Sequence, residues 1–284
     1  MKKILTLAMA ALLVASLAFP AFAGDKKEVK LAYVEWDCAT ATTNVIKAVL
    51  QERMGYEVEV LPVAAAIMWQ AVSTGDVDAM ATAWLPVTHA EYLKRVEKNV
   101  VNLGPTVSGA KLGWAVPTYV TVDSIADLNK YADKLDGKII GIDPGAGLMG
   151  LSEKAMEEYK LTDLELMEGS GATMTASLNN AIKNKEWIVV TAWSPHWLFG
   201  RWDMKYLKDP KGILGGEETI NTIVRKGLKE DKPEVYAFLD KFAWKDANQL
   251  QMVMAWNQAE DADPYENAKR FIKENKEQVD GWLK

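Results

Sequence analysis

Two short segments share the pattern Thr-Ala-Trp-x-Pro, and each is followed by one of the two histidines of the chain. The first, TAWLPVTH, contains Trp84 and His89, and the second, TAWSPHW, contains Trp193 and His196. Indole faces attract cations through the ring quadrupole, at about 0.5–2 kcal/mol per contact, and an imidazole donates hydrogen bonds to carboxylates. One tryptophan at a strand end is most often core, but a matched pair favours a binding site.

A third tryptophan, Trp36, follows the first predicted strand in VEWDCATATTN. Three indoles around one cleft suit a quaternary ammonium group. This group has no N–H to donate to a carboxylate, and burying its methyl groups is favourable. We therefore expect Trp36, Trp84 and Trp193 to line a ligand site. Cys38, the only cysteine, has no recognisable catalytic context and is expected to be a buried or half-buried thiol.

A glycine-rich loop offers an anion site. Residues Gly145–Gly150 read GAGLMG after the strand IIGID and before a helix, with Glu165 twenty residues further on. This is the pattern of a dinucleotide site, but a helix N-terminus binds any anion, a carboxylate included. Asp143 and Pro144 place a negative charge and a rigid turn beside the loop, which disfavours pyrophosphate. A plain glycine turn is the other alternative.

The bulk properties exclude several classes of protein. Residues 1–23 read as a signal peptide, with Lys2 and Lys3 before an apolar run and a small-residue cleavage site near Ala23. Removing the two lysines from 33 basic residues leaves 31 against 39 acidic ones, a formal charge of −8. No basic patch supports nucleic-acid binding. Two histidines and one cysteine make a zinc site hard to assemble, and no G-x-S-x-G nucleophile motif is present.

Strands and helices alternate along the chain, which predicts an α/β fold with parallel sheets and covering helices. The first predicted helix spans 41–54 and the last 264–282. Two similar units each end a strand in Thr-Ala-Trp-x-Pro, and ligands sit at the carboxyl ends of such strands. Segments 111–117 and 211–220 are the predicted crossovers between two lobes. The expected division is 24–113 with 216–284 for lobe 1 and 114–215 for lobe 2.

The segments VEWDCATATTN, TAWLPVTH, GIDPGAGLMG and VVTAWSPHW, followed by INTIVRKG, resemble the substrate-binding proteins of glycine betaine/proline betaine ABC importers. The resemblance covers nearly the whole mature chain. It implies a two-lobed periplasmic-binding-protein fold with two crossover hinge strands. It also implies an aromatic cage of Trp36, Trp84 and Trp193, and a carboxylate held by the backbone of Gly147 and Leu148 and by His89.

The expected function is an exported, periplasmic receptor that captures a quaternary-ammonium osmolyte and delivers it to the membrane permease of an ABC importer. We expect a monomer without catalytic activity, cofactor, metal or nucleic-acid partner. The expected osmolyte is glycine betaine or proline betaine, and choline and carnitine are the alternative ligands within this class. An exported α/β enzyme for a nucleotide or phosphoester is an alternative from another class, and so is a secreted protein whose tryptophans are core.

Overall fold

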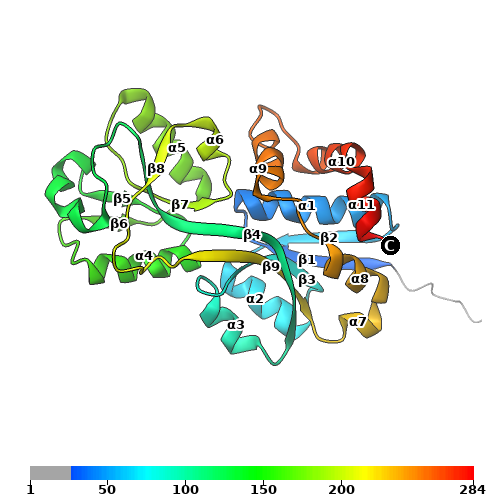
Figure 1. Cartoon of the computed structure of the whole chain (residues 1–284). Helices are drawn as coiled ribbons and strands as arrows, with labels where there is room; N and C mark the ends of the chain where they lie inside the picture. The colour runs from blue at the N-terminus through cyan, green and yellow to red at the C-terminus, as the bar shows by residue number, and fades with distance from the viewer. Residues whose placement is uncertain (1–26) are drawn as a thin grey trace, which may run out of the picture.

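The computed structural model describes residues 27–284, so the predicted signal peptide lies outside the described residues. Two groups of helices and strands are joined by two long strands, β4 (Val100–Pro117) and β9 (Glu217–Arg225), which cross between them (Figure 1). We call the group that contains the first and last described residues the first lobe, and the other group the second lobe. Within residues 27–284, no helix combines the length and apolar character needed to cross a bilayer.

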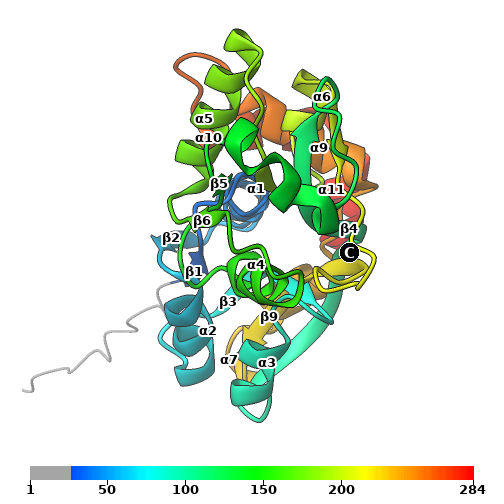
Figure 2. The ribbon, with the colours of Figure 1, turned by 90° about the vertical axis from the view of Figure 1, so that its left-hand side faces the viewer.

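The first lobe is built on three parallel strands, β1 (Glu28–Tyr33), β2 (Glu57–Pro62) and β3 (Ala79–Leu85). One face of these strands carries α1, with α9 and α10 packed on it, and α2 and α3 lie on the other side (Figures 1 and 2). The helices of this lobe are α1 (Asp37–Glu52), α2 (Ala65–Thr74), α3 (Ala90–Val96), α7 (Leu228–Asp231), α8 (Pro233–Lys241), α9 (Ala247–Trp256), α10 (Pro264–Glu274) and α11 (Lys276–Trp282). After β9 the chain therefore returns to its starting lobe.

The second lobe repeats the arrangement on a smaller scale, with parallel strands β5 (Lys138–Ile140), β6 (Glu165–Met167) and β7 (Val190–Ser194). It has its own apolar core, in which the fully buried Trp114 donates its indole N–H to Ser152 Oγ at 2.8 Å. The remaining elements are the 3₁₀ segment η1 (Ile125–Leu135), the helices α4 (Gly147–Glu158), α5 (Gly171–Asn184) and α6 (Leu198–Arg201), and the strand β8 (Met204–Tyr206).

Within the described part of the chain, the two crossover strands join the lobes into one sheet of nine strands. Its order is β2-β1-β3-β9-β4-β7-β5-β6, with β8 on β4, and β4 and β9 run antiparallel to each other and to the strands that they join. The predicted architecture of two mainly parallel lobes with two crossover strands is confirmed. The predicted boundary at 113/114 falls inside β4 and that at 215/216 just before β9. These boundaries stay predictions.

Two predicted helices differ from the structure, one in where it begins and one in its continuity. The first helix begins at Asp37 rather than at 41, directly after Trp36, and its acidic first turn suits the positive end of a helix dipole. The segment 264–282 is two helices, because Asn275 leaves the helical region (φ −119°, ψ 42°) and ends α10 there. Because α1 begins at Asp37, Trp36 lies at the N-terminal end of this helix, where the second lobe approaches it.

Candidate ligand site between the lobes

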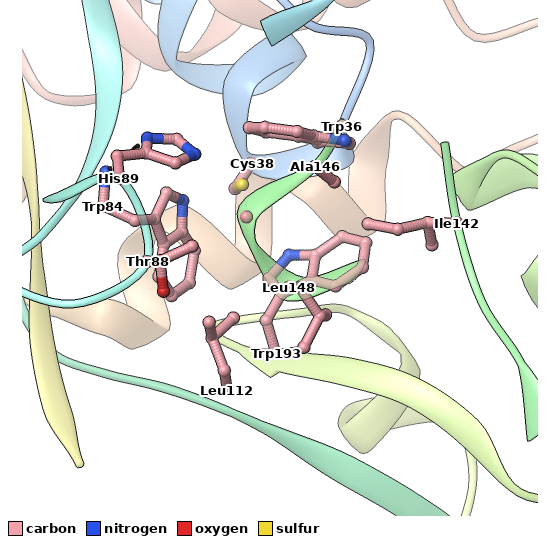
Figure 3. Close-up of a pocket in the computed structure, with 11 residues that line it drawn as sticks. Trp36, Cys38, Trp84, Thr88, His89, Leu112, Ile142, Ala146, Leu148 and Trp193 are labelled. Carbon is pink, nitrogen blue, oxygen red and sulfur yellow. Dashed lines mark hydrogen bonds between the residues drawn. The ribbon is translucent and has the colours of Figure 1, made fainter. Parts of the chain in front are cut away.

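A cavity lies between the two lobes at the carboxyl ends of their parallel strands, and the space free of protein atoms there, including the part open to solvent, is about 300 Å³. Figure 3 shows side chains from both lobes around this space. All six residues predicted to bind a ligand line it; their contact with a ligand stays a prediction. The lining residues are Trp36, Cys38, Trp84, Thr88, His89, Leu112, Ile142, Ala146, Gly147, Leu148 and Trp193.

The three indoles reach the cavity from different elements. Trp84 is the penultimate residue of β3, Trp193 occupies the corresponding position of β7, and Trp36 precedes α1. The three side chains are 3–6% exposed. In both Thr-Ala-Trp-x-Pro segments the peptide bond before the proline is cis, so the two copies share backbone geometry as well as sequence. The sequence repeat thus places one indole of each lobe at the same cavity.

His89 is tied to Trp84 by two hydrogen bonds, which explains the spacing of these residues. The backbone N–H of His89 donates to the Trp84 carbonyl (2.9 Å), and the Trp84 N–H donates to His89 Nδ1 (3.1 Å). The imidazole is fully buried, and this burial lowers its pKa to about 3. It is therefore neutral at physiological pH, and since Nδ1 accepts, the proton is on Nε2. Nε2 has no partner within the described chain, so a buried N–H donor is left for a ligand.

Two aromatic residues that the sequence did not single out hold this imidazole in place. Trp69 of α2 meets the His89 ring edge to face at 5.9 Å between ring centroids, and Tyr92 of α3 meets it at 5.8 Å. Trp69 and Tyr92 are themselves stacked, with an interplanar angle of 9°. Packing on these sides restricts rotation of the imidazole and keeps Nε2 in one orientation.

His196 has a different role from His89. Its Nδ1 accepts from the Leu198 N–H (3.1 Å), and its ring packs edge to face on Trp193 at 4.4 Å between centroids. Its Nε2 lies 3.2 Å from an Asp37 carboxylate oxygen, at an angle that does not make a hydrogen bond. His196 does not line the cavity. The second histidine therefore supports an indole wall instead of facing a ligand.

The glycine loop places the N-terminus of α4 at the cavity. The backbone N–H groups of Gly147 and Leu148 have no acceptor within the described chain, and no side chain caps the helix. Together with the His89 Nε2–H they are unpaired donors beside the same space. No lysine, arginine or carboxylate side chain is among the described residues that line it. An anion here would be held by neutral donors and the helix dipole.

Gly147 also packs directly against Thr88 of the first lobe. A Cβ at this position would lie 2.3 Å from the carbonyl oxygen of Thr88 and 2.5 Å from its Cγ2. Thr88 in turn is fixed by Glu218 of β9, whose buried carboxylate accepts from the Thr88 N–H (3.2 Å) and hydroxyl (2.5 Å). A glycine is therefore required for the lobes to meet as they do here.

The sequence reasoning assigned no role in the site to five lining residues: Cys38, Thr88, Leu112, Ile142 and Ala146. Burial raises the pKa of the Cys38 thiol to about 12, so it is a neutral thiol in the cavity wall. Thr88, directly before His89, and Cys38, within VEWDCATATTN, lay inside segments already singled out. Leu112 belongs to a crossover strand and carries no local signal of a site.

Comparisons with known proteins agree with this geometry. Residues 27–274 match the model of the family OpuAC, the substrate-binding domain of ABC-type glycine betaine transport systems. The glycine betaine/carnitine transport binding protein GbuC of Listeria monocytogenes is 42% identical over 167 residues, which are 58% of this chain and 54% of that protein. The chain thus spans about half the length of this relative.

Two solved structures are close in shape. Lactococcal OpuAC in its closed-liganded conformation with glycine betaine is 44% identical, with a TM-score of 0.85 over 90% of this chain and 99% of that one. An ABC-transporter choline-binding protein in complex with choline is 26% identical, with a TM-score of 0.84 over 91% and 92% of the two chains. The fold is thus the two-lobed periplasmic-binding-protein fold. The chain belongs to the family of substrate-binding domains of ABC-type glycine betaine transport systems.

Proposed function

We propose that this protein binds glycine betaine in the cavity between its lobes, as a solute receptor without catalytic activity. The observation that carries the proposal is the His89 Nε2–H, a fully buried donor without a partner, beside a cavity walled by three indoles. A buried unpaired donor is costly unless a ligand satisfies it. The cavity therefore suits a molecule with an apolar cation at one end and a carboxylate at the other.

In this proposal the trimethylammonium group lies among Trp36, Trp84 and Trp193, whose ring faces supply negative potential. Burying its three methyl groups adds a hydrophobic contribution. The carboxylate accepts from the N–H groups of Gly147 and Leu148 and from His89 Nε2. Neither end of a zwitterion then needs a charged side chain in the cavity wall, which agrees with the uncharged lining.

Binding is proposed to favour the closed arrangement of the lobes. Ligand contacts come from β3 and the turn after it in the first lobe and from β7 and α4 in the second. The lobes also contact each other directly: the Tyr92 hydroxyl donates to the Gly145 carbonyl at 2.7 Å, and Thr88 packs on Gly147. A ligand that touches both lobes shifts the equilibrium toward the closed state by its difference in affinity for the two states.

Choline is the second candidate, since it shares the ammonium group and since a choline-binding protein has a similar fold. It lacks the carboxylate that three unpaired N–H donors would bind, so glycine betaine is favoured. Carnitine and proline betaine carry both charges but are bulkier, and they remain alternative ligands of the same cage.

The location and partner are part of the proposal. An N-terminal signal peptide cleaved near Ala23 would export the chain, and the receptor would act as a monomer in the periplasm. It would deliver its ligand to the permease of an ABC importer, with ATP hydrolysis elsewhere in the complex, and contribute to osmoprotection.

A titration followed by tryptophan fluorescence tests the proposal, because indoles from both lobes surround the ligand. The mature protein is titrated with glycine betaine, choline, carnitine and proline betaine, and its thermal unfolding is measured with and without a nucleotide. Saturable binding of glycine betaine, tighter than of choline, is expected. No response to any of these ammonium compounds, or stabilisation by the nucleotide alone, would refute the proposal.

A further inference from the structure

One cage residue makes a hydrogen bond to the opposite lobe. The indole N–H of Trp36, in the first lobe, donates to the carboxylate of Asp143, in the second, at 3.0 Å to Oδ1 and 3.1 Å to Oδ2. The two residues are 107 positions apart in the sequence. Trp36 is 6% exposed and lines the cavity, whereas Asp143 lies outside it, between β5 and α4.

Apart from its own backbone N–H, the Asp143 carboxylate has no other partner within the described residues. Among these residues it forms no ion pair, and it does not cap α4, although it precedes that helix by four residues. Partial burial raises the pKa of Asp143, and the Trp36 N–H opposes this effect. Partly burying a carboxylate that has no basic partner costs free energy. Stabilisation of the second lobe by itself therefore does not explain why Asp143 lies there.

The contact belongs to the region where the lobes meet. Asp143 begins the loop that continues to Gly145, whose carbonyl accepts from Tyr92, and to Gly147, which packs on Thr88. All three contacts depend on the lobes being together. Of the three contacts, only that of Asp143 involves an aromatic residue that lines the cavity, Trp36.

We propose that Asp143 is a positioning residue that fixes the Trp36 indole when the lobes close, and so completes the aromatic cage only in the closed state. The inference rests on the proposed function. The carboxylate also increases the negative potential of the indole to which it is bound, which strengthens the attraction of the ring for a cation. Closure and cation binding then reinforce each other through one side chain.

The hydrogen bond exists only after closure, so its loss affects dissociation more than association. For Asp143→Ala, the dissociation constant for glycine betaine should rise about tenfold, the size expected for one hydrogen bond to a charged group. Stopped-flow tryptophan fluorescence should assign this change to a faster dissociation rate, with the association rate within about twofold of wild type. Asp143→Asn, which keeps one acceptor oxygen, should recover part of the affinity.

A double-mutant cycle tests whether the effect passes through Trp36. Trp36→Phe keeps an aromatic face, although a smaller one, and removes the N–H donor, so Asp143→Ala should cost little more in that background. Asp133→Ala is the matched control, because Asp133 is an exposed aspartate of the same lobe without an interlobe contact. It should bind like wild type, and circular dichroism should show all variants folded.

The outcomes separate this inference from the proposed function. If the wild type binds and the dissociation constant of Asp143→Ala is within twofold of the wild-type value, the inference is overturned and the proposed function stands. Additive effects of Asp143→Ala and Trp36→Phe would overturn it as well, because Asp143 would then act apart from the indole. A wild type that binds neither glycine betaine nor choline would instead refute the proposed function. If choline is the ligand, the same variants are measured with choline, and the same results are expected.

Discussion

Replacing His89 should separate recognition of the carboxylate from recognition of the cation. The imidazole makes two hydrogen bonds with different purposes: Nδ1 accepts from the Trp84 N–H, and Nε2–H is free for the ligand. His89→Asn places an amide oxygen near the position of Nδ1 and keeps the acceptor for Trp84, but it does not reach the ligand. His89→Gln does the reverse, extending a donor toward the ligand and losing that acceptor.

The expected loss of affinity depends on whether the ligand group that accepts from His89 is charged. A hydrogen bond from a buried neutral donor to a carboxylate contributes about 1.5–3 kcal/mol, so His89→Asn should weaken glycine betaine binding by roughly 10- to 150-fold. The hydroxyl of choline is neutral, and losing a bond to it costs about 0.5–1.5 kcal/mol. The preference for glycine betaine over choline should therefore fall about tenfold.

Isothermal titration calorimetry with both ligands is the assay, and the ratio of the two dissociation constants is the readout. Small shifts of the cage affect both ligands and cancel in the ratio. His89→Gln should keep the ratio near that of wild type but unfold at a lower temperature, because the buried Trp84 N–H loses its partner. A ratio unchanged within twofold in His89→Asn would refute the assignment of Nε2 to the carboxylate.

Three further predictions concern the cage, the contact between lobes and pH. Trp84→Ala and Trp193→Ala should each weaken glycine betaine binding by well over 1 kcal/mol, since truncation also admits water to the cage; wild-type affinity in both, measured by calorimetry, would rule out the cage. Gly147→Ala should abolish tight binding without lowering the melting temperature of the ligand-free protein, because the methyl group meets the Thr88 carbonyl only when the lobes close; tight binding by this variant would contradict the closure described. Since the pKa of His89 is lowered from 6.5 to about 3 in the fold, the imidazole stays neutral and affinity should be constant between about pH 5 and 8. The unfolded chain binds this proton more readily, so the stability contributed by His89 is complete above pH 6.5 and is lost as pH falls toward 3, which denaturant titrations at several pH values would detect.

The repeated tryptophan motif made much of the site predictable. Trp84, Trp193 and the glycine loop follow strands, and strand ends of parallel sheets gather at one edge. The local patterns therefore predicted that the three indoles and the glycine loop lie at one cleft, where the structure has them; their contact with a ligand stays a prediction. His89 was the stronger candidate of the two histidines, but nothing in the sequence showed that Nδ1 would be occupied and Nε2 free.

Features that depend on contacts between separate segments were not predictable from the sequence. Only 111–117 of the 18-residue strand β4 was predicted, because Gly104, Pro105 and Gly109 interrupt its alternation and its pairing with β9 shifts register there. Trp69 contacts His89 from another helix of the same lobe, and Asp143 contacts Trp36 from the opposite lobe. These contacts depend on how separate elements pack, which no local pattern encodes.

The most direct test of the central claim is a calorimetric titration of the mature protein with glycine betaine, alongside choline. We expect saturable binding at one site for glycine betaine, and much weaker binding for choline, which leaves the three N–H donors without a carboxylate. Equal affinity for the two ligands would contradict the assignment of Gly147, Leu148 and His89 to a carboxylate. No binding of either ligand, checked at a second temperature, would refute the proposed function.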